Sequence, residues 1–244
     1  MSMIPEKPPF KLLDILYKKE FILFVVLVSI LIINSNISPY FLDLYNLIDS
    51  TFLFSEKAII ALTMTFVIIA RQIDLSVASI IAVSSCVLGY TTSLGYDTWL
   101  VISLTLLSGA LCGAFNGAII TKFAIPSIIV TIGTMSLFRG LAYSFLEDSY
   151  YNKFPKLVGN LGGGYLFGYI PYAFLTFIIL AIIFAFILHK TSVGKKIYSI
   201  GNNPDAAQYT GIAVDKYTFV LFTLNGLFSA LAAIFLSGRL SSVR

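Results

Sequence analysis

The chain has 244 residues, of which 58% are hydrophobic, 15% are aromatic and only 11% are charged, and its formal net charge is +4. Soluble domains carry roughly 25% charged residues, so this composition excludes a soluble globular domain, a disordered tail and a nucleic-acid-binding protein. At roughly 20 residues per spanning helix, the length holds about six to eight membrane spans and leaves no room for a soluble catalytic domain.

The first 20 residues are polar, and no small-residue cleavage site follows the first apolar run. A removed signal peptide would need such a site. We therefore interpret residues 1–20 as a cytoplasmic tail that precedes the first membrane helix.

Seven apolar segments follow the tail. They are solidly apolar and lack the alternating pattern of a transmembrane barrel, so we expect helices. The sequence predicts an all-α polytopic membrane protein with about seven transmembrane helices in one domain over 21–244. The segments lie near 21–40, 55–71, 75–96, 99–121, 126–146, 171–189 and 217–237.

The distribution of basic residues predicts the orientation, because lysine and arginine accumulate on the cytoplasmic side. With the N-terminus inside, the cytoplasmic side receives ten of them: Lys7, Lys11, Lys18, Lys19, Arg71, Lys122, Lys190, Lys195, Lys196 and Lys216. The outside receives five: Lys57, Lys153, Lys156, Arg239 and Arg244. This bias favours a cytoplasmic N-terminus, a cytoplasmic loop at 189–216 and an external loop at 147–170.

A polar stretch from Arg71 to Ser76 interrupts the second and third apolar segments. One interpretation is a tight cytoplasmic turn in which Asp74 or Ser76 caps the next helix. The other is a break within the membrane, where helix ends and polar side chains line a path. The sequence alone does not distinguish between these two interpretations.

Arg139 lies inside the fifth apolar segment, where an arginine costs roughly 2.5–3.5 kcal/mol on insertion scales. Neighbouring strong hydrophobic residues return roughly 0.3–0.6 kcal/mol each, so the segment still inserts. The guanidinium must face protein or water. It either forms a structural ion pair, reaches toward the outer surface, or takes part in moving a solute.

Small and polar residues recur within the spans. Gly109, Gly113 and Gly117 are spaced for close approach of helices, which is the simplest interpretation. Amides at membrane depth are costly unless they are paired or hydrated. For a path through the membrane, the candidate residues are therefore Asp74, Ser76, Asn116, Thr131 and Asn225.

The cytoplasmic loop contains a short predicted helix at 203–210. Asn203 is a good N-cap, Pro204 suits the first helical position, and Asp205 meets the positive end of the helix dipole. Gly211 is placed to end the helix in a left-handed conformation. This helix is either a simple connector or a plug for a partner's groove, with a surface made by Ala206, Ala207 and Tyr209.

Several strings resemble a known family. Asp205-Ala206-Ala207-x-x-x-Gly211 is similar to the E-A-A-x-x-x-G signature of ABC importer permeases, with Asp in place of Glu. The string IDLSV at 73–77 resembles the I-D-L-S-V-G motif of ribose-type monosaccharide permeases, with Ala78 in place of Gly. Further similar blocks follow in order: Asn116-Gly117, IPSIIVTIGTM at 125–135, FRG at 138–140 and GKKIYSIGNN at 194–203.

The resemblance covers about 55–244, and SEKAI at 55–59 with IARQIDL at 69–75 is most similar to L-rhamnose importer permeases. It implies a multi-pass inner-membrane subunit that pairs with a second permease, receives a monosaccharide from a periplasmic or lipid-anchored binding protein and contacts an ATPase through 203–210. ATP and Mg would bind that ATPase, since this chain has no G-x-x-x-x-G-K-[ST] motif. Family members have about ten spans, so we expect a C-terminally truncated fragment of that fold.

Two other functions stay open from the residues. An ion-coupled carrier would need intramembrane carboxylates, for which Asp74 is the candidate. A truncated, non-transporting subunit is the other alternative. An enzyme is not expected, because the chain has one histidine and no paired carboxylates, nucleophile or metal-ligand set.

Overall fold

The computed structural model describes residues 19–146 and 150–243, with side chains from residue 21 onward. The expected tail over 1–20, including Lys7, Lys11 and Lys18, thus falls almost wholly outside the described residues. The chain divides into two compact units between Leu47 and Ile48. The first unit contains α2 (Lys19–Ile37), an apolar helix, and the start of α3 (Leu44–Ile69).

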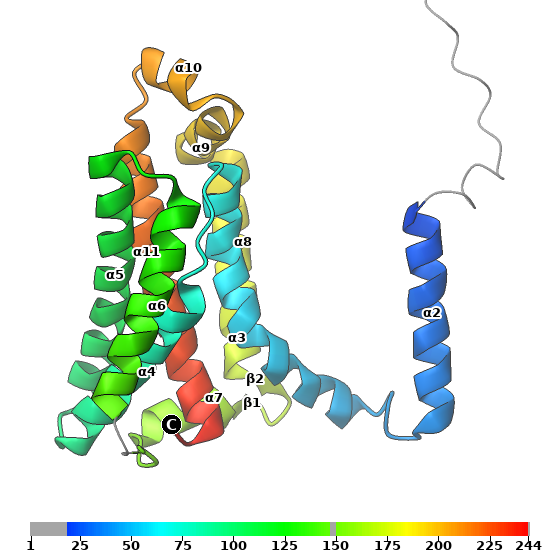
Figure 1. The fold of residues 1–244 in the computed structure, drawn as a ribbon. Helices are drawn as coiled ribbons and strands as arrows, with labels where there is room; N and C mark the ends of the chain where they lie inside the picture. The colour runs from blue at the N-terminus through cyan, green and yellow to red at the C-terminus, as the bar shows by residue number, and fades with distance from the viewer. Residues whose placement is uncertain (1–18, 147–149, 244) are drawn as a thin grey trace, which may run out of the picture. The chain divides into compact units, whose positions relative to one another are not determined.

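The second unit is a bundle of helices with one short hairpin of antiparallel strands (Figure 1). After α3, its elements are α4 (Val77–Ser93), α5 (Thr98–Phe123), α6 (Ser127–Leu146), α7 (Lys156–Gly163), β1 (Tyr165–Leu166), β2 (Ile170–Pro171), α8 (Tyr172–Lys190), α9 (Ser192–Asn202), α10 (Pro204–Tyr209) and α11 (Val214–Leu240).

Within the described residues, five helices are long and apolar enough to cross a membrane: α3, α5, α6, α8 and α11. The apolar stretches Phe21–Ile37 and Val77–Ser93 are shorter. These seven helices correspond to the seven predicted segments, and the all-α polytopic prediction is confirmed. The second segment begins at Leu44 instead of near 55, because Asp49 and its polar neighbours interrupt the apolar run without interrupting the helix.

The centre of the bundle is α11, which packs against α5, α4 and α7. Its contact with α5 is close enough for backbones to touch. A Cβ atom on Gly113 would collide with the carbonyl oxygen of Phe222, and one on Gly226 would collide with that of Gly109. The glycine spacing on α5 therefore serves helix packing, as predicted.

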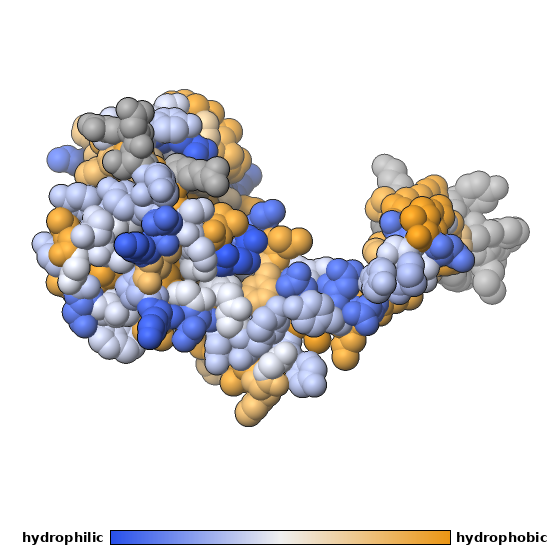
Figure 2. Space-filling model, turned by 90° about the horizontal axis from the view of Figure 1, so that it is seen from below, coloured by the Kyte–Doolittle hydropathy of each residue, from blue (hydrophilic) through white to orange (hydrophobic). Residues whose placement is uncertain are grey.

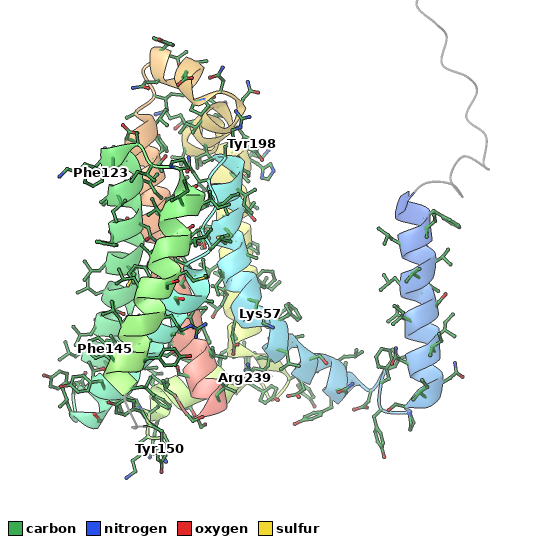
Figure 3. All side chains as sticks on the ribbon, viewed as in Figure 1. Lys57, Phe123, Phe145, Tyr150, Tyr198 and Arg239 are labelled. Atoms are coloured by element: carbon green, nitrogen blue, oxygen red, sulfur yellow. The ribbon has the colours of Figure 1, made fainter. Side chains whose placement is uncertain are left out.

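The bundle has two distinct ends. The helices α9 and α10 lie at one end, and α7, the hairpin and the C-terminus lie at the other (Figure 1). Tyr198 and Phe123 mark the first end, and Lys57, Phe145 and Arg239 lie toward the second (Figure 3). The second end, seen in Figure 2, mixes hydrophilic with hydrophobic residues. The loops expected on opposite sides of the membrane thus lie at opposite ends.

Candidate functional site

The stretch between α3 and α4 is irregular and runs alongside α6. Arg71 has a positive φ of 60°, and residues 72–76 have no regular structure. The Ile73 N–H donates to Ser127 Oγ at 3.0 Å, and the Thr131 hydroxyl donates to the Ile73 carbonyl at 3.3 Å. Side chains of α6 thereby satisfy backbone groups that helical hydrogen bonds leave free.

Asp74, only 2% exposed, is the centre of a buried hydrogen-bond network. Its Oδ1 accepts from the N–H and the hydroxyl of Ser76 at 2.9 and 2.6 Å, and its Oδ2 accepts from the Asn225 amide at 2.8 Å. Asn116 Nδ2 donates to Ser76 Oγ at 2.8 Å, and the Thr63 hydroxyl donates to Asn225 Oδ1 at 2.7 Å. The network joins α3, α5 and α11 to the start of α4.

The structure therefore brings together all five residues expected on a path. Four belong to this network, and Thr131 holds the adjacent backbone. Asn225 lies eleven residues after Val214, which places it roughly 16 Å along α11 at 1.5 Å per residue. The irregular stretch thus begins beside α9 at the end of the bundle, where Arg71 donates to the Asn202 carbonyl. It reaches inward to the middle of α11 at Asp74, which also accepts from the N-cap residue Ser76.

Charge is balanced differently here than in an ion pair. Within the described residues, the salt bridge formed is that of Arg239 with Glu56, so Asp74 is held by three hydrogen bonds instead of a cation. Charge-assisted hydrogen bonds of this kind offset the cost of burying a carboxylate. The amide oxygen of Asn116 and the hydroxyl of Ser79 are buried without a described partner. The Asn116 amide oxygen thus gives the network a buried acceptor that no described residue uses.

The helix expected at 203–210 is α10. The Ala206 N–H donates to Asn203 Oδ1 at 3.1 Å, Pro204 occupies the first turn, and Asp205 follows it. Gly211 has a φ of +85°, which favours glycine and ends the helix. The predicted start and stop signals are confirmed.

The expected surface of α10 requires a correction. Ala206 is exposed, but Ala207 is only 4% exposed and packs with Val67, Ile197 and Leu221. Tyr209 is 93% exposed. Ala206 and Ala207 are neighbours in sequence and, at 100° per residue, face different directions on a helix. The surface available to a partner contains Ala206 and Tyr209, whereas Ala207 anchors α10 to its own chain.

Arg139 lines a cavity of about 250 Å³ between α4, α6 and α11. Its side chain is exposed, and no described residue forms an ion pair with it. Tyr143, Ser85 and Ser237 also line this cavity, and the hydroxyl of Ser237 donates to Ser85 Oγ at 3.1 Å. Of the three possibilities raised by the sequence, the structural ion pair is absent from the described part of the chain.

One charged pair was not foreseen from the sequence. Arg239 on α11 donates from Nε to Glu56 Oε1 at 2.8 Å and from Nη2 to Oε2 at 3.1 Å. Glu56 is 5% exposed and is on α3. The only sequence signal was a charge beside each of two apolar segments, and 183 residues of separation conceal their contact.

Comparison with known proteins identifies the fold's family. A family model described as a branched-chain amino acid transport system permease component matches residues 46–244. The chain belongs to this permease family. The permease is 35% identical over 228 residues to the ribose import permease protein of Haemophilus influenzae, which covers 91% of this chain and 69% of the relative.

Two further relatives agree. The ribose import permease protein of Bacillus subtilis is 36% identical over 226 residues, covering 91% of this chain and 69% of the relative. The autoinducer 2 import system permease protein LsrD of Klebsiella pneumoniae is 33% identical over 239 residues, covering 92% and 69%. No solved structure matches the chain.

Family membership has direct consequences. The permease is a multi-pass inner-membrane transport subunit and not an enzyme. Family membership also implies an ABC importer that contains an ATPase and a substrate-binding protein as separate chains.

Proposed function

We propose that this permease moves a monosaccharide, a pentose or a deoxyhexose such as rhamnose, inward across the membrane. The sugar class is supported by two relatives named for ribose. Rhamnose rests only on the strings at 55–59 and 69–75. A separate ATPase that binds ATP and Mg supplies the energy, an external sugar-binding protein delivers the sugar, and a second permease subunit completes the path.

The observation that carries this proposal is α10. It is a short, well-capped helix at the end of the bundle, with Ala206 and Tyr209 exposed and Ala207 fixed in a core. A protruding helix with a rigid base suits insertion into a partner's groove. We assign α10 as the ATPase-coupling helix.

The path is proposed to run beside the Asp74 network. The irregular backbone between α3 and α4 reaches Asn225 in the middle of α11, and irregular backbone at membrane depth occurs where it is buried in protein or lines a cavity. Asp74, Ser76, Asn116, Thr131 and Asn225 supply polar groups on several helices there. When these helices separate, the same groups become available to sugar hydroxyls.

Substitution of Ala206 with Arg tests the coupling role. We expect Ala206→Arg to abolish co-purification of the ATPase and to reduce sugar uptake at least tenfold, because a bulky charge blocks a close helix contact. Asn160→Arg is the control, since Asn160 is exposed on α7 at the other end of the bundle. It should retain the ATPase.

Normal uptake and normal ATPase stoichiometry in Ala206→Arg would contradict the coupling role. Uptake that survives depletion of ATP but stops when the ion gradient is dissipated would instead favour an ion-coupled carrier. A chain that is folded and membrane-inserted yet never recovers an ATPase would favour a non-transporting subunit.

A further inference from the structure

An apolar groove lies at the end of the bundle that carries α9. Its volume is about 620 Å³, within the range of roughly 300–1,000 Å³ usual for ligand sites. It is formed by α3, α8, α9 and α11, and its walls are chiefly Phe66, Phe184, Ile187, Val220 and Leu224. This groove is separate from the Arg139 cavity, and Thr63 is its one point of contact with the Asp74 network.

Two lysines also line this groove. Lys196 on α9 and Lys216 on α11 are both exposed, and the Lys196 ammonium lies 5.8 Å from the centre of the Tyr217 ring. Neither lysine forms a salt bridge with a described residue. Asp215 is adjacent in sequence but does not line the groove. The groove thus combines an apolar interior with two unneutralised positive charges.

The helix α9, which carries Lys196, has a buried apolar side and an exposed basic side. On α9, Gly194, Ile197 and Ile200 are buried, while Lys195 and Lys196 are exposed. The apolar side of α9 therefore packs into the protein's own core, and its lysines are left on the outer side, where they are free to meet an anionic headgroup. Figure 1 shows α9 following α8 at the end of the bundle that also carries α10.

We propose that this groove binds an anionic phospholipid of the cytoplasmic leaflet. An acyl chain lies among Phe66, Phe184 and Leu224, and the phosphate lies between Lys196 and Lys216. Basic pockets between membrane helices on the cytoplasmic side recognise anionic headgroups. The bound lipid regulates or anchors the permease, and its binding does not depend on the proposed sugar path.

Other occupants fit the groove less well. A sugar would leave its hydroxyls facing aromatic and aliphatic walls, which costs hydrogen bonds. A second copy docked through the same surface would follow a two-fold axis and bring the two lysines of each chain toward those of the other. A single anionic lipid satisfies both the apolar walls and the charges.

Native mass spectrometry of the full chain, with any subunits that accompany it, tests the site. The probes are dioleoyl phosphatidylglycerol and dioleoyl phosphatidylcholine, titrated in a mild detergent. We expect one phosphatidylglycerol per chain to bind in preference to phosphatidylcholine. Lys196→Gln combined with Lys216→Gln should weaken phosphatidylglycerol binding roughly 10- to 30-fold, given the contribution of a basic residue at a lipid surface.

The matched control is Lys190→Gln combined with Lys195→Gln. These lysines are exposed in the same loop but do not line the groove, so phosphatidylglycerol binding should change less than twofold. A second variant, Val220→Trp, fills the groove from a residue that is 41% exposed and should weaken binding of both lipids.

Three results would overturn the proposal: equal affinity for the two lipids, equal losses in the two double-lysine variants, or unchanged lipid binding in Val220→Trp. A change in the number of subunits caused by Val220→Trp would show instead that a protein covers the groove. None of these readouts depends on uptake, so the lipid site and the proposed transport function fail independently.

Discussion

At the scale of single residues, two sets of buried polar side chains join separate helices: the Asp74 network and the Glu56–Arg239 pair, which we call the clamp. Asp74 accepts hydrogen bonds from Ser76 and Asn225, and the Asn225 amide also accepts from the Thr63 hydroxyl. Glu56 and Arg239 are joined by two parallel hydrogen bonds, the strongest geometry available to this pair. In both cases the loss of one partner leaves a buried group unsatisfied.

Asn225→Ala tests the network. It leaves Asp74 Oδ2 without its donor, whereas the Thr63 hydroxyl can still donate to the Ile60 carbonyl at 3.0 Å. An unsatisfied buried polar group costs about 1–3 kcal/mol, more when it is charged. We expect the free energy of unfolding to fall by about 3 kcal/mol in detergent-based denaturation. Thr223→Ala is the control on the same helix, because its hydroxyl bonds only to the carbonyl of Phe219 within α11. Equal losses in the two variants would contradict a special role for Asn225.

A double-mutant cycle tests the clamp between α3 and α11. Arg239→Gln leaves the buried Glu56 carboxylate without a cation, and we expect a loss of about 2 kcal/mol, less than for a fully buried pair because the Arg239 side chain is 24% exposed. Adding Glu56→Gln should recover part of that loss. Additive losses, measured by thermal unfolding, would show that the two residues act independently.

At the scale of elements, local signals were sufficient for some helices and insufficient for others. The start and end of α10 follow from Asn203, Pro204 and Gly211, because caps act over a few residues. The seven apolar segments follow from hydropathy in the same way. The sequence did not predict the start of α3 at Leu44. A hydropathy pattern locates the apolar part of a helix, whereas the helix itself begins where its backbone hydrogen bonds begin.

Contacts between elements lay beyond the sequence. Polarity and depth named the five path residues, but only the fold shows that four of them share hydrogen bonds. The burial of Ala207 depends on α3 and α11, which are far away in sequence. The pairing of Glu56 with Arg239 is equally non-local. Such contacts are fixed by packing, for which one sequence carries no local signal.

The contact between α5 and α11 gives a prediction about packing. Gly113→Ala adds a Cβ atom that meets the Phe222 backbone, so we expect a destabilisation of roughly 3 kcal/mol, at the upper end for overpacking. Gly133→Ala on α6 is the matched control, since its Cβ would meet nothing within 4 Å. Thermal unfolding of the two variants checks this, and a control as unstable as Gly113→Ala would refute the packing explanation.

At the scale of the whole molecule, transport requires the two ends of the bundle to communicate. The proposed ATPase contact is at α10, and the Glu56–Arg239 pair lies toward the opposite end (Figure 3). Between them, α11 contacts both: it begins after α10, holds Asn225 in its middle and carries Arg239 in its last turn. One helix therefore contacts α10, the Asp74 network and Glu56.

The burial of Ala207 has a mechanical consequence. The cluster that holds it includes Val67 and Ala70, at the point where α3 gives way to the irregular stretch before Asp74, and Gly201 is pressed against the carbonyl of Ile69. The helix α10 is thus packed against the end of α3, where the irregular stretch begins. A force applied to α10 by the proposed ATPase would therefore be transmitted to the start of the irregular stretch through these packed side chains.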